Sequence, residues 1–341
     1  MRDDKPGMPG VSAWVPGQRW FDSLRGFVHL FHQAYRAESH DDIIFCAEFL
    51  AKAFPVKGDS LMHLGKTLRA ASPMDDRRKA QQLVTHWASE AGIADPADPA
   101  SDGSSARYMT CDGSSCVMWT LLHVTVTAVA VRGITGKPLL GDGSVVAKAD
   151  EDAFPNIHLC MSFVRRFVSA FLTCKRCKEN FLKDFDDCDF GRCHFSDFRS
   201  LALWIWRVHN AISMQVASRH HAQVDRRWPM YQDCPACWRQ ELVLGHAGRR
   251  LRPLSWSQEE LDAPFHTDPV FWHLVRTYIG LSRIQVDQSD LSPQERSQVE
   301  DVIEHDRREE VRAAKAAPAQ HRGFVEQPPP PARGAAPAER V

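Results

Sequence analysis

The stretch Phe171-Leu-Thr-Cys174-Lys-Arg-Cys177-Lys-Glu-Asn180-Phe181 joins two segments of helical character and places two cysteines between them. Upstream, apolar residues recur at intervals of three and four, as on one buried helix face: Cys160, Phe163, Val164, Phe167, Val168 and Phe171. Downstream, residues 179–186 can also form a helix. The pattern therefore predicts a helical protein with Cys174 and Cys177 at a helix N-terminus.

Further helices are predicted on both sides of this stretch. Helices are predicted at residues 116–131, 196–218 and 270–279, although the Thr and Val content of 116–131 would also permit a strand, and no convincing hairpin signal separates these segments. Segments before residue 90 repeat the helical pattern, and Pro55 ends one of them. These features favour an all-α fold built on a helical bundle.

Composition divides the chain into regions. They are a flexible leader (1–18), a helix-rich region (19–90), a linker (91–107), a main domain (108–281), and a charged helix with a proline-rich disordered tail (282–341). The N-terminus lacks the apolar core of a signal peptide. The apolar runs at 119–131 and 270–281 suggest no transmembrane segment, because they are too short or interrupted. With 42 basic and 43 acidic residues, no charge excess favours nucleic acid.

Most of the ten cysteines occur in close pairs. A thiol of Cys174 or Cys177 at a helix N-terminus has a lowered pKa, because unpaired N–H groups and the flanking Lys175 and Arg176 favour the thiolate. A thiolate attacks disulfides, so a redox role is predicted. A structural disulfide or half of a zinc site remain alternatives.

The other cysteines suggest different roles. Cys234-Pro-Ala-Cys237 lies far downstream of the first pair, which counts against a joint zinc ribbon, and is interpreted as a structural disulfide. Cys188 and Cys193 form either a local disulfide or a shuttle dithiol. Two more, Cys46 and Cys160, lie on apolar helix faces and are predicted to be buried thiols.

Aromatic residues and histidines share helix faces elsewhere in the main domain. Trp119 and His123 are spaced i,i+4, and a second face carries Trp206, His209, Asn210 and Ser213. Such rings beside imidazole and amide donors can line a flat heterocycle, although a lone histidine on an apolar face is more often a core residue.

Four motifs, in this order, resemble the Erv/ALR sulfhydryl oxidases. They are the segments Cys116–Val126, Phe171–Phe181 and Leu203–Ser213, followed by Trp228-Pro229 with Cys234-Pro-Ala-Cys237. The segment 270–280 resembles the end of the oxidase domain in the quiescin sulfhydryl oxidase subfamily, and residues 46–68 resemble its helical pseudo-oxidase region. That subfamily also carries a thioredoxin domain, which has no counterpart in this sequence.

The resemblance implies an FAD-binding four-helix bundle that oxidises thiols. Protein thiols or dithiols would be the substrates, O2 the electron acceptor and H2O2 the product, with electrons passing through the catalytic Cys174 and Cys177. A separate thioredoxin-fold protein is a candidate shuttle. The family's location implies the secretory pathway (endoplasmic reticulum or Golgi) or secretion.

The resemblance also assigns site residues. FAD-binding positions are Trp119, His123, Asn180, Trp206, His209, Asn210, Ser213, Arg227 and Trp228. Asn180 stands where the family has a histidine, Ser213 where it has an asparagine, and Arg227 would replace a phosphate-binding lysine. Structural disulfides are expected at Cys111–Cys116 and Cys234–Cys237. The competing hypotheses are a non-catalytic zinc-binding adaptor and a degenerate oxidase relative.

Overall fold

The computed structural model describes residues 16–71, 76–93, 114–136, 139, 155–195, 197–219, 227–239 and 257–280. These ranges contain no β-strand, only an isolated bridge between Trp238 and Phe265, and the all-α prediction is confirmed. The α-helices are α1 (Pro16–Ala34), α2 (His40–Ala53), α3 (Gly58–Ala71), α4 (Arg77–Glu90), α5 (Ser114–Thr135), α6 (Ile157–Phe171), α7 (Lys175–Asp186), α8 (Phe198–Arg219), α10 (Gln258–Asp262) and α11 (Thr267–Tyr278). The 3-10 segments are η2 (Ala37–Ser39), η4 (Asp189–His194) and η5 (Pro235–Cys237).

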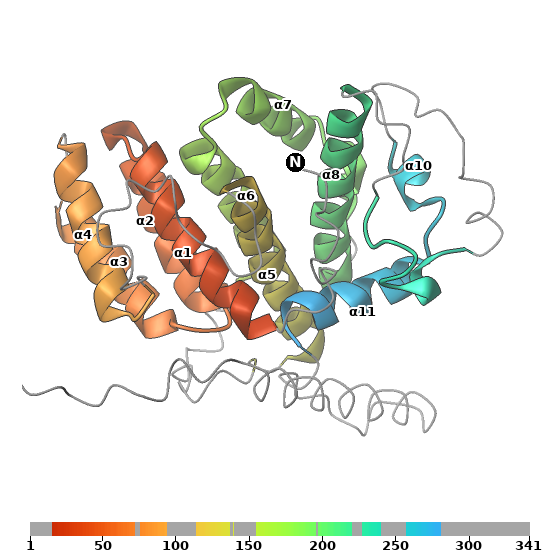
Figure 1. Cartoon of the computed structure of the whole chain (residues 1–341), viewed down its shortest axis with the longest axis horizontal. Coiled ribbons are helices and arrows are strands. Elements are labelled where there is room, and N and C mark those ends of the chain that lie inside the picture. The colour runs from red at the N-terminus through yellow and green to blue at the C-terminus, as the bar shows by residue number, and fades with distance from the viewer. Residues whose placement is uncertain are drawn as a thin grey trace, which may run out of the picture.

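The helices form one continuous assembly (Figure 1). Helices α1 to α4 lie on one side, α5 and α6 in the middle, and α8 with α10 on the other side. Helix α7 connects the tops of α6 and α8 in this view, and α11 crosses the lower ends of α5 and α8. The bundle of α5 to α8 is therefore closed by α11 at the end away from α7.

Helix α5 is the central element of the core. Every residue from Val117 to Val131 is buried, because α1, α6, α8 and α11 pack around it. The helix is long and apolar enough to cross a membrane by length and composition, so the expectation that this run is too short is wrong. Of its most apolar stretch of 18 residues, 83% is buried inside the protein, as expected for a core helix.

The starts of α6 and α7 carry side-chain caps. Asn156 caps α6, where its side chain accepts a hydrogen bond from the Leu159 N–H at 2.9 Å. Cys174 caps α7, where its sulfur accepts from the Cys177 N–H at 3.3 Å. Both starts agree with the predicted positions, since a polar side chain just before a helix satisfies one of its unpaired N–H groups.

The N-terminal helices share one hydrophobic core with the main domain. Phe27 of α1 lies 5.4 Å from Phe171 of α6, and Phe49 of α2 stacks on Phe163 of α6 at 4.6 Å, measured between ring centroids. The described residues of the helix-rich region therefore pack directly on the main domain. The predicted leader before residue 16, the linker from residue 94 to 107, Cys111 and the tail from residue 282 lie outside the described residues.

Candidate redox site

Cys174 and Cys177 form a disulfide at the start of α7, and both residues are exposed. The helix reaches into the core through Phe181 and Phe185, whose rings meet the edge of Trp204 on α8. Its first turn remains open to solvent. An external thiolate can therefore reach either sulfur, and the disulfide has the accessibility that thiol–disulfide exchange requires.

The surroundings of this disulfide favour a thiolate once the bond opens. The Cys177 N–H already points at the Cys174 sulfur, and the first turn of α7 contains no acidic residue. Lys178 anchors the turn by donating to the Ser169 carbonyl at 2.6 Å, and burial lowers the pKa of its amine. Helix N–H groups and nearby cations stabilise negative charge at this position.

A cluster of rings gathers between α5, α8 and α11, and is called the ring cluster below. Trp119 stacks on His209 with a centroid separation of 4.4 Å and an interplanar angle of 6°. His123 stacks on Tyr278 at 4.8 Å and 5°. The two histidines are joined by a hydrogen bond of 3.1 Å between His123 Nε2 and His209 Nδ1. The predicted faces of α5 and α8 thus meet, and Tyr278 completes the arrangement.

Both histidines of the ring cluster are held neutral. Burial lowers the pKa of His209 to about 4. Burial lowers the pKa of His123 well below its usual value, and His209 and Arg19 add to the effect. Within the part of the chain that is described, the buried Nδ1 of His123 has no hydrogen-bond partner. A buried polar atom of this kind is uncommon and points to a partner group from a ligand or water.

Residues 227–239, the closing segment, are bound to α8 through its predicted polar face. The Asn210 side chain donates to the Trp228 carbonyl at 2.9 Å and accepts from the Trp228 N–H at 2.8 Å. The Trp206 indole donates to the same carbonyl at 2.5 Å. The Trp238 indole donates to the Pro229 carbonyl at 2.9 Å, so several bonds fix the segment over α8.

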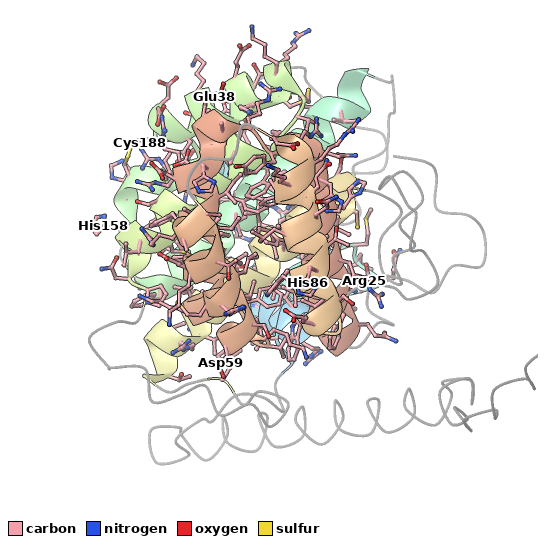
Figure 2. The ribbon with its side chains drawn as sticks, turned by 90° about the vertical axis from the view of Figure 1, so that its left-hand side faces the viewer. Arg25, Glu38, Asp59, His86, His158 and Cys188 are labelled. Atoms are coloured by element: carbon pink, nitrogen blue, oxygen red, sulfur yellow. A yellow bond between two sulfur atoms is a disulfide. The ribbon has the colours of Figure 1, made fainter. Side chains whose placement is uncertain are left out.

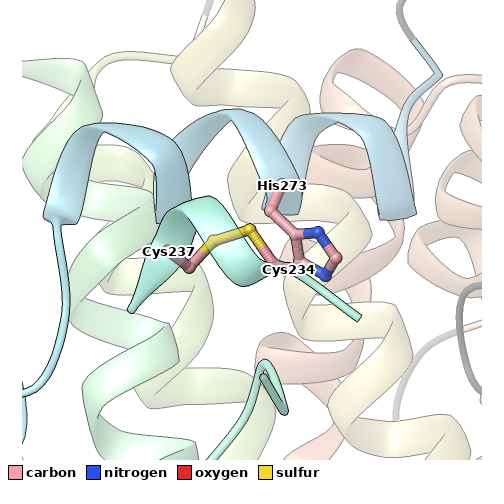
Figure 3. Close-up of side chains that lie close together, drawn as sticks. All are labelled: Cys234, Cys237 and His273. Atoms are coloured by element: carbon pink, nitrogen blue, oxygen red, sulfur yellow. A yellow bond between two sulfur atoms is a disulfide. The ribbon is translucent and has the colours of Figure 1, made fainter. Parts of the chain in front are cut away.

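The closing segment also carries the Cys234–Cys237 disulfide, which lies beside His273 of α11 (Figure 3). The sulfurs and one imidazole nitrogen lie within 4.8 Å of one another, a spacing that metal ligands can have. Both sulfurs are bonded to each other, however, and metals bind cysteine as the thiolate. In this oxidised form the disulfide closes the η5 turn, which packs against α11, and its sulfurs are not free to bind a metal.

The remaining predicted site residues differ in their exposure and in their contacts. Asn180 is exposed on α7, and Ser213 is half-buried on α8. Arg227 is buried and donates to the Glu260 carbonyl of α10 at 3.1 Å. Cys116 is disulfide-bonded. Among the described residues, no hydrogen bond or ring contact joins the Cys174–Cys177 pair to the ring cluster.

Sequence reasoning missed three residues that line the ring cluster. Tyr278 stacks on His123, His273 lies 5.0 Å from the Trp228 ring, and the guanidinium of Arg19 lies 5.8 Å from the Tyr278 ring. His273 and Tyr278 fall within the helix predicted at 270–279, but a helix motif does not show which neighbour it faces. Arg19 lies near the start of α1, in the helix-rich region that the sequence set apart from the main domain.

Residues 116–229 match the Erv1 / Alr family. Sulfhydryl oxidase 1 of Oryza sativa subsp. japonica is 27% identical over 138 residues, which are 38% of this chain and 22% of that protein. Sulfhydryl oxidase 2 of Mus musculus is 24% identical over 148 residues, 39% of this chain and 19% of that protein. The chain therefore aligns with about a fifth of the length of these relatives.

A solved structure shows the same fold. The sulfhydryl oxidase fragment of human QSOX1 superposes with a TM-score of 0.51 and 14% sequence identity, covering 81% of this chain and 99% of the fragment. The fold and the site together define a helical-bundle protein with an exposed Cys174–Cys177 disulfide at a helix N-terminus. Over residues 116–229 the chain is similar to the Erv1 / Alr family, and its curated relatives are named sulfhydryl oxidases, so the predicted resemblance to the Erv/ALR sulfhydryl oxidases is confirmed.

Proposed function

We propose that this chain is an FAD-dependent sulfhydryl oxidase, a thiol:oxygen oxidoreductase that forms disulfides in protein thiols and reduces O2 to H2O2. The observation that carries the proposal is the exposed Cys174–Cys177 disulfide at the N-terminus of α7, inside a domain of the Erv1/Alr family. An exposed disulfide at a helix N-terminus is a good electron acceptor, because the thiolates formed on opening are stabilised there.

The protein's own cysteines perform the exchange. A substrate thiolate attacks the Cys174 sulfur, the bond between Cys174 and Cys177 breaks, and the electron pair leaves on Cys177. A second substrate thiolate then attacks the substrate sulfur of this mixed disulfide, and its bond to the Cys174 sulfur breaks. The substrate leaves as a disulfide, and both cysteines are left reduced. Lys175, with a side chain 89% exposed and its Nζ 3.9 Å from Glu179 Oε1, carries a positive charge near the incoming thiolate.

The ring cluster supports binding of FAD. It offers flat ring faces, neutral imidazoles and the unpaired Nδ1 of His123, which suit a planar heterocycle with polar edges. A further ring does not fit between Trp119 and His209, because two stacking distances would need about 7 Å or more and their centroids are 4.4 Å apart. Bound FAD would supply two-electron transfer from a thiolate to O2, and Trp119, His123, His209 and Trp228 are the residues proposed to hold it.

Substrate and location are proposed from the same family relation. Relatives named as sulfhydryl oxidases support protein thiols as substrates, delivered directly or through a separate thioredoxin-fold protein. Secretory compartments are where stable disulfides form, so the secretory pathway or the exterior is the proposed location. The zinc-adaptor alternative is disfavoured, because the four cysteines that it needs are paired in two disulfides.

The purified full chain tests the proposal. We expect a yellow protein with flavin absorption that consumes O2 and releases H2O2 when a small dithiol is added. Cys174→Ser and Cys177→Ser should each lower this turnover by at least 100-fold while keeping the bound flavin. Cys46→Ala removes a buried free thiol on α2 and should retain turnover.

Each contrary result has a distinct meaning. A folded, colourless protein that cannot be reconstituted with FAD would support the degenerate relative. A flavoprotein whose turnover survives either cysteine substitution would exclude Cys174 and Cys177 as the catalytic pair.

A further inference from the structure

A second disulfide, Cys188–Cys193, follows directly after α7 and lies at the surface. Cys193 is exposed, Cys188 is half-buried, and Figure 2 shows Cys188 at the outer edge of the molecule. The pair closes η4, a short turn that packs against α8 and α10. This disulfide is therefore accessible to solvent, in contrast to Cys237, which is fully buried.

The turn inside this disulfide has an unfavourable backbone. Cys188 has a φ of 66° and Phe190 a φ of 58°, both in the left-handed region that residues other than glycine rarely adopt. Gly191 has a φ of 83°, and a Cβ there would lie 2.2 Å from the Gln258 Oε1. Opening the disulfide would let the two strained residues relax, and strain of this kind makes a disulfide easier to reduce.

A positive charge contacts one of the two sulfurs. Arg192 Nη2 lies 3.3 Å from the Cys188 sulfur, and its Nε donates to the Phe185 carbonyl. Of the carboxylates near Cys188, which also include Asp189, those of Asp186 and Asp187 are paired with Arg165 and Lys183. Arg192 is thus placed to stabilise a thiolate on Cys188, whereas Cys193 presents the accessible sulfur.

We propose that the Cys188–Cys193 disulfide is a second thiol-exchange site, at which an external thiol attacks Cys193 and Cys188 leaves as a thiolate beside Arg192. The attacking thiolate forms a new bond to the Cys193 sulfur, and the bond between Cys193 and Cys188 breaks. A second external thiolate then releases the substrate as a disulfide. Two electrons and, after protonation, two protons remain on Cys188 and Cys193.

The second site acts separately from the Cys174–Cys177 pair. The two disulfides lie at opposite ends of α7, a helix of 12 residues that is about 18 Å long at 1.5 Å per residue. An intact helix of that length prevents direct attack between them within one copy. The two pairs therefore accept thiols independently.

Anaerobic reduction with reduced glutathione tests this inference on the full chain carrying Cys174→Ser and Cys177→Ser. After acid quenching and alkylation, mass spectrometry of the peptides reports each cysteine. We expect the Cys188–Cys193 pair to open at a glutathione concentration at least tenfold below that needed for Cys234–Cys237. The glutathione adduct should form on Cys193. Opening of both pairs together, or an adduct on Cys188, would overturn the proposal.

Arg192 provides a matched pair of variants on the same background. Arg192→Gln should slow the opening by about tenfold, whereas Arg192→Lys keeps the charge and should stay within about threefold of the parent. Equal rates in both variants would refute the assigned role of the charge, provided that circular dichroism shows both to be folded. The readout needs no oxidase turnover, so an inactive flavin site and a wrong exchange site give different results.

Discussion

Gly26 on α1 lies at a point of close approach between α1 and the central helix α5. A Cβ built at this glycine would lie 2.5 Å from both the Cβ and the Cγ2 of Val117 on α5. Carbon atoms need about 3.5–4.0 Å at optimal separation, and the branched Val117 side chain has little freedom to move away. Gly26→Ala should therefore push α1 from α5.

Two opposing terms set the size of the effect. Alanine in a helix interior gains up to about 1 kcal/mol over glycine, while overpacking a core costs roughly 1–3 kcal/mol. The net result should be a loss of about 1 kcal/mol, with a range from about zero to 2. A Cβ at Gly17 in the same helix would meet no atom within 4 Å, so Gly17→Ala should only increase stability.

Urea unfolding followed by circular dichroism measures both variants. Gly26→Ala should unfold at a lower urea concentration than the parent, and Gly17→Ala at the same or a higher one. Combining Gly26→Ala with Val117→Ala should show a favourable coupling of at least about 0.5 kcal/mol, because the smaller residue makes room for the new methyl group. If Gly26→Ala is as stable as Gly17→Ala, the close packing of α1 on α5 is wrong.

Three further predictions concern the bundle and the closing segment. Asn210→Asp removes the donor to the Trp228 carbonyl and should cost about 1–3 kcal/mol in urea unfolding and weaken FAD retention. Asp262→Asn breaks the paired bonds of 2.8 Å with the buried Arg207 and should cost about 3 kcal/mol. Burial lowers the pKa of His209 to about 4, so the folded protein binds fewer protons than the unfolded chain and loses stability as the pH falls from about 6.5 to 4; His209→Gln should flatten this dependence in pH-resolved thermal melts.

Controls for these variants are available in the same chain. Glu48→Gln breaks an exposed pair with Arg69 and should cost less than about 1 kcal/mol. If Asp262→Asn costs no more stability than Glu48→Gln, Arg207 is not desolvated. If Asn210→Asp retains FAD fully, the closing segment has no part in cofactor binding. If His209→Gln loses stability on acidification as the parent does, other groups cause that loss.

Periodicity in the sequence predicted several of the long helices, whereas α5 was predicted as an apolar segment that follows a turn-forming sequence. The spacing of Cys160 to Phe171 marked α6, and Asn156 marked its start because asparagine is a common N-cap. The start of α7 was predicted from the position of the Cys174–Cys177 motif. Helix α10 was missed, since five residues are too few to show a period. Its capping box at Ser257 and Glu260 was the one available signal.

The candidate site was predictable only where its residues share a helix. Trp119 with His123, and Trp206 with His209 and Asn210, stood out because i,i+3 and i,i+4 residues lie on the same face. Their stacking partners come from elements far away in the chain, and no local spacing shows that Tyr278 packs on His123. Tertiary contacts decide that pairing, so the sequence alone could not identify it.

These contacts also assign a role to the N-terminal region that composition had set apart. Trp20 of α1 donates to the Tyr278 carbonyl at 2.7 Å, and the buried Arg19 lies against the ring of the same tyrosine. Tyr278 in turn stacks on His123, whose pKa the positive charge of Arg19 helps to lower. A neutral His123 keeps one ring nitrogen as an acceptor, which a protonated imidazole lacks. Helix α1 therefore helps to set both the position and the hydrogen-bonding capacity of the ring cluster, which makes it part of the candidate site.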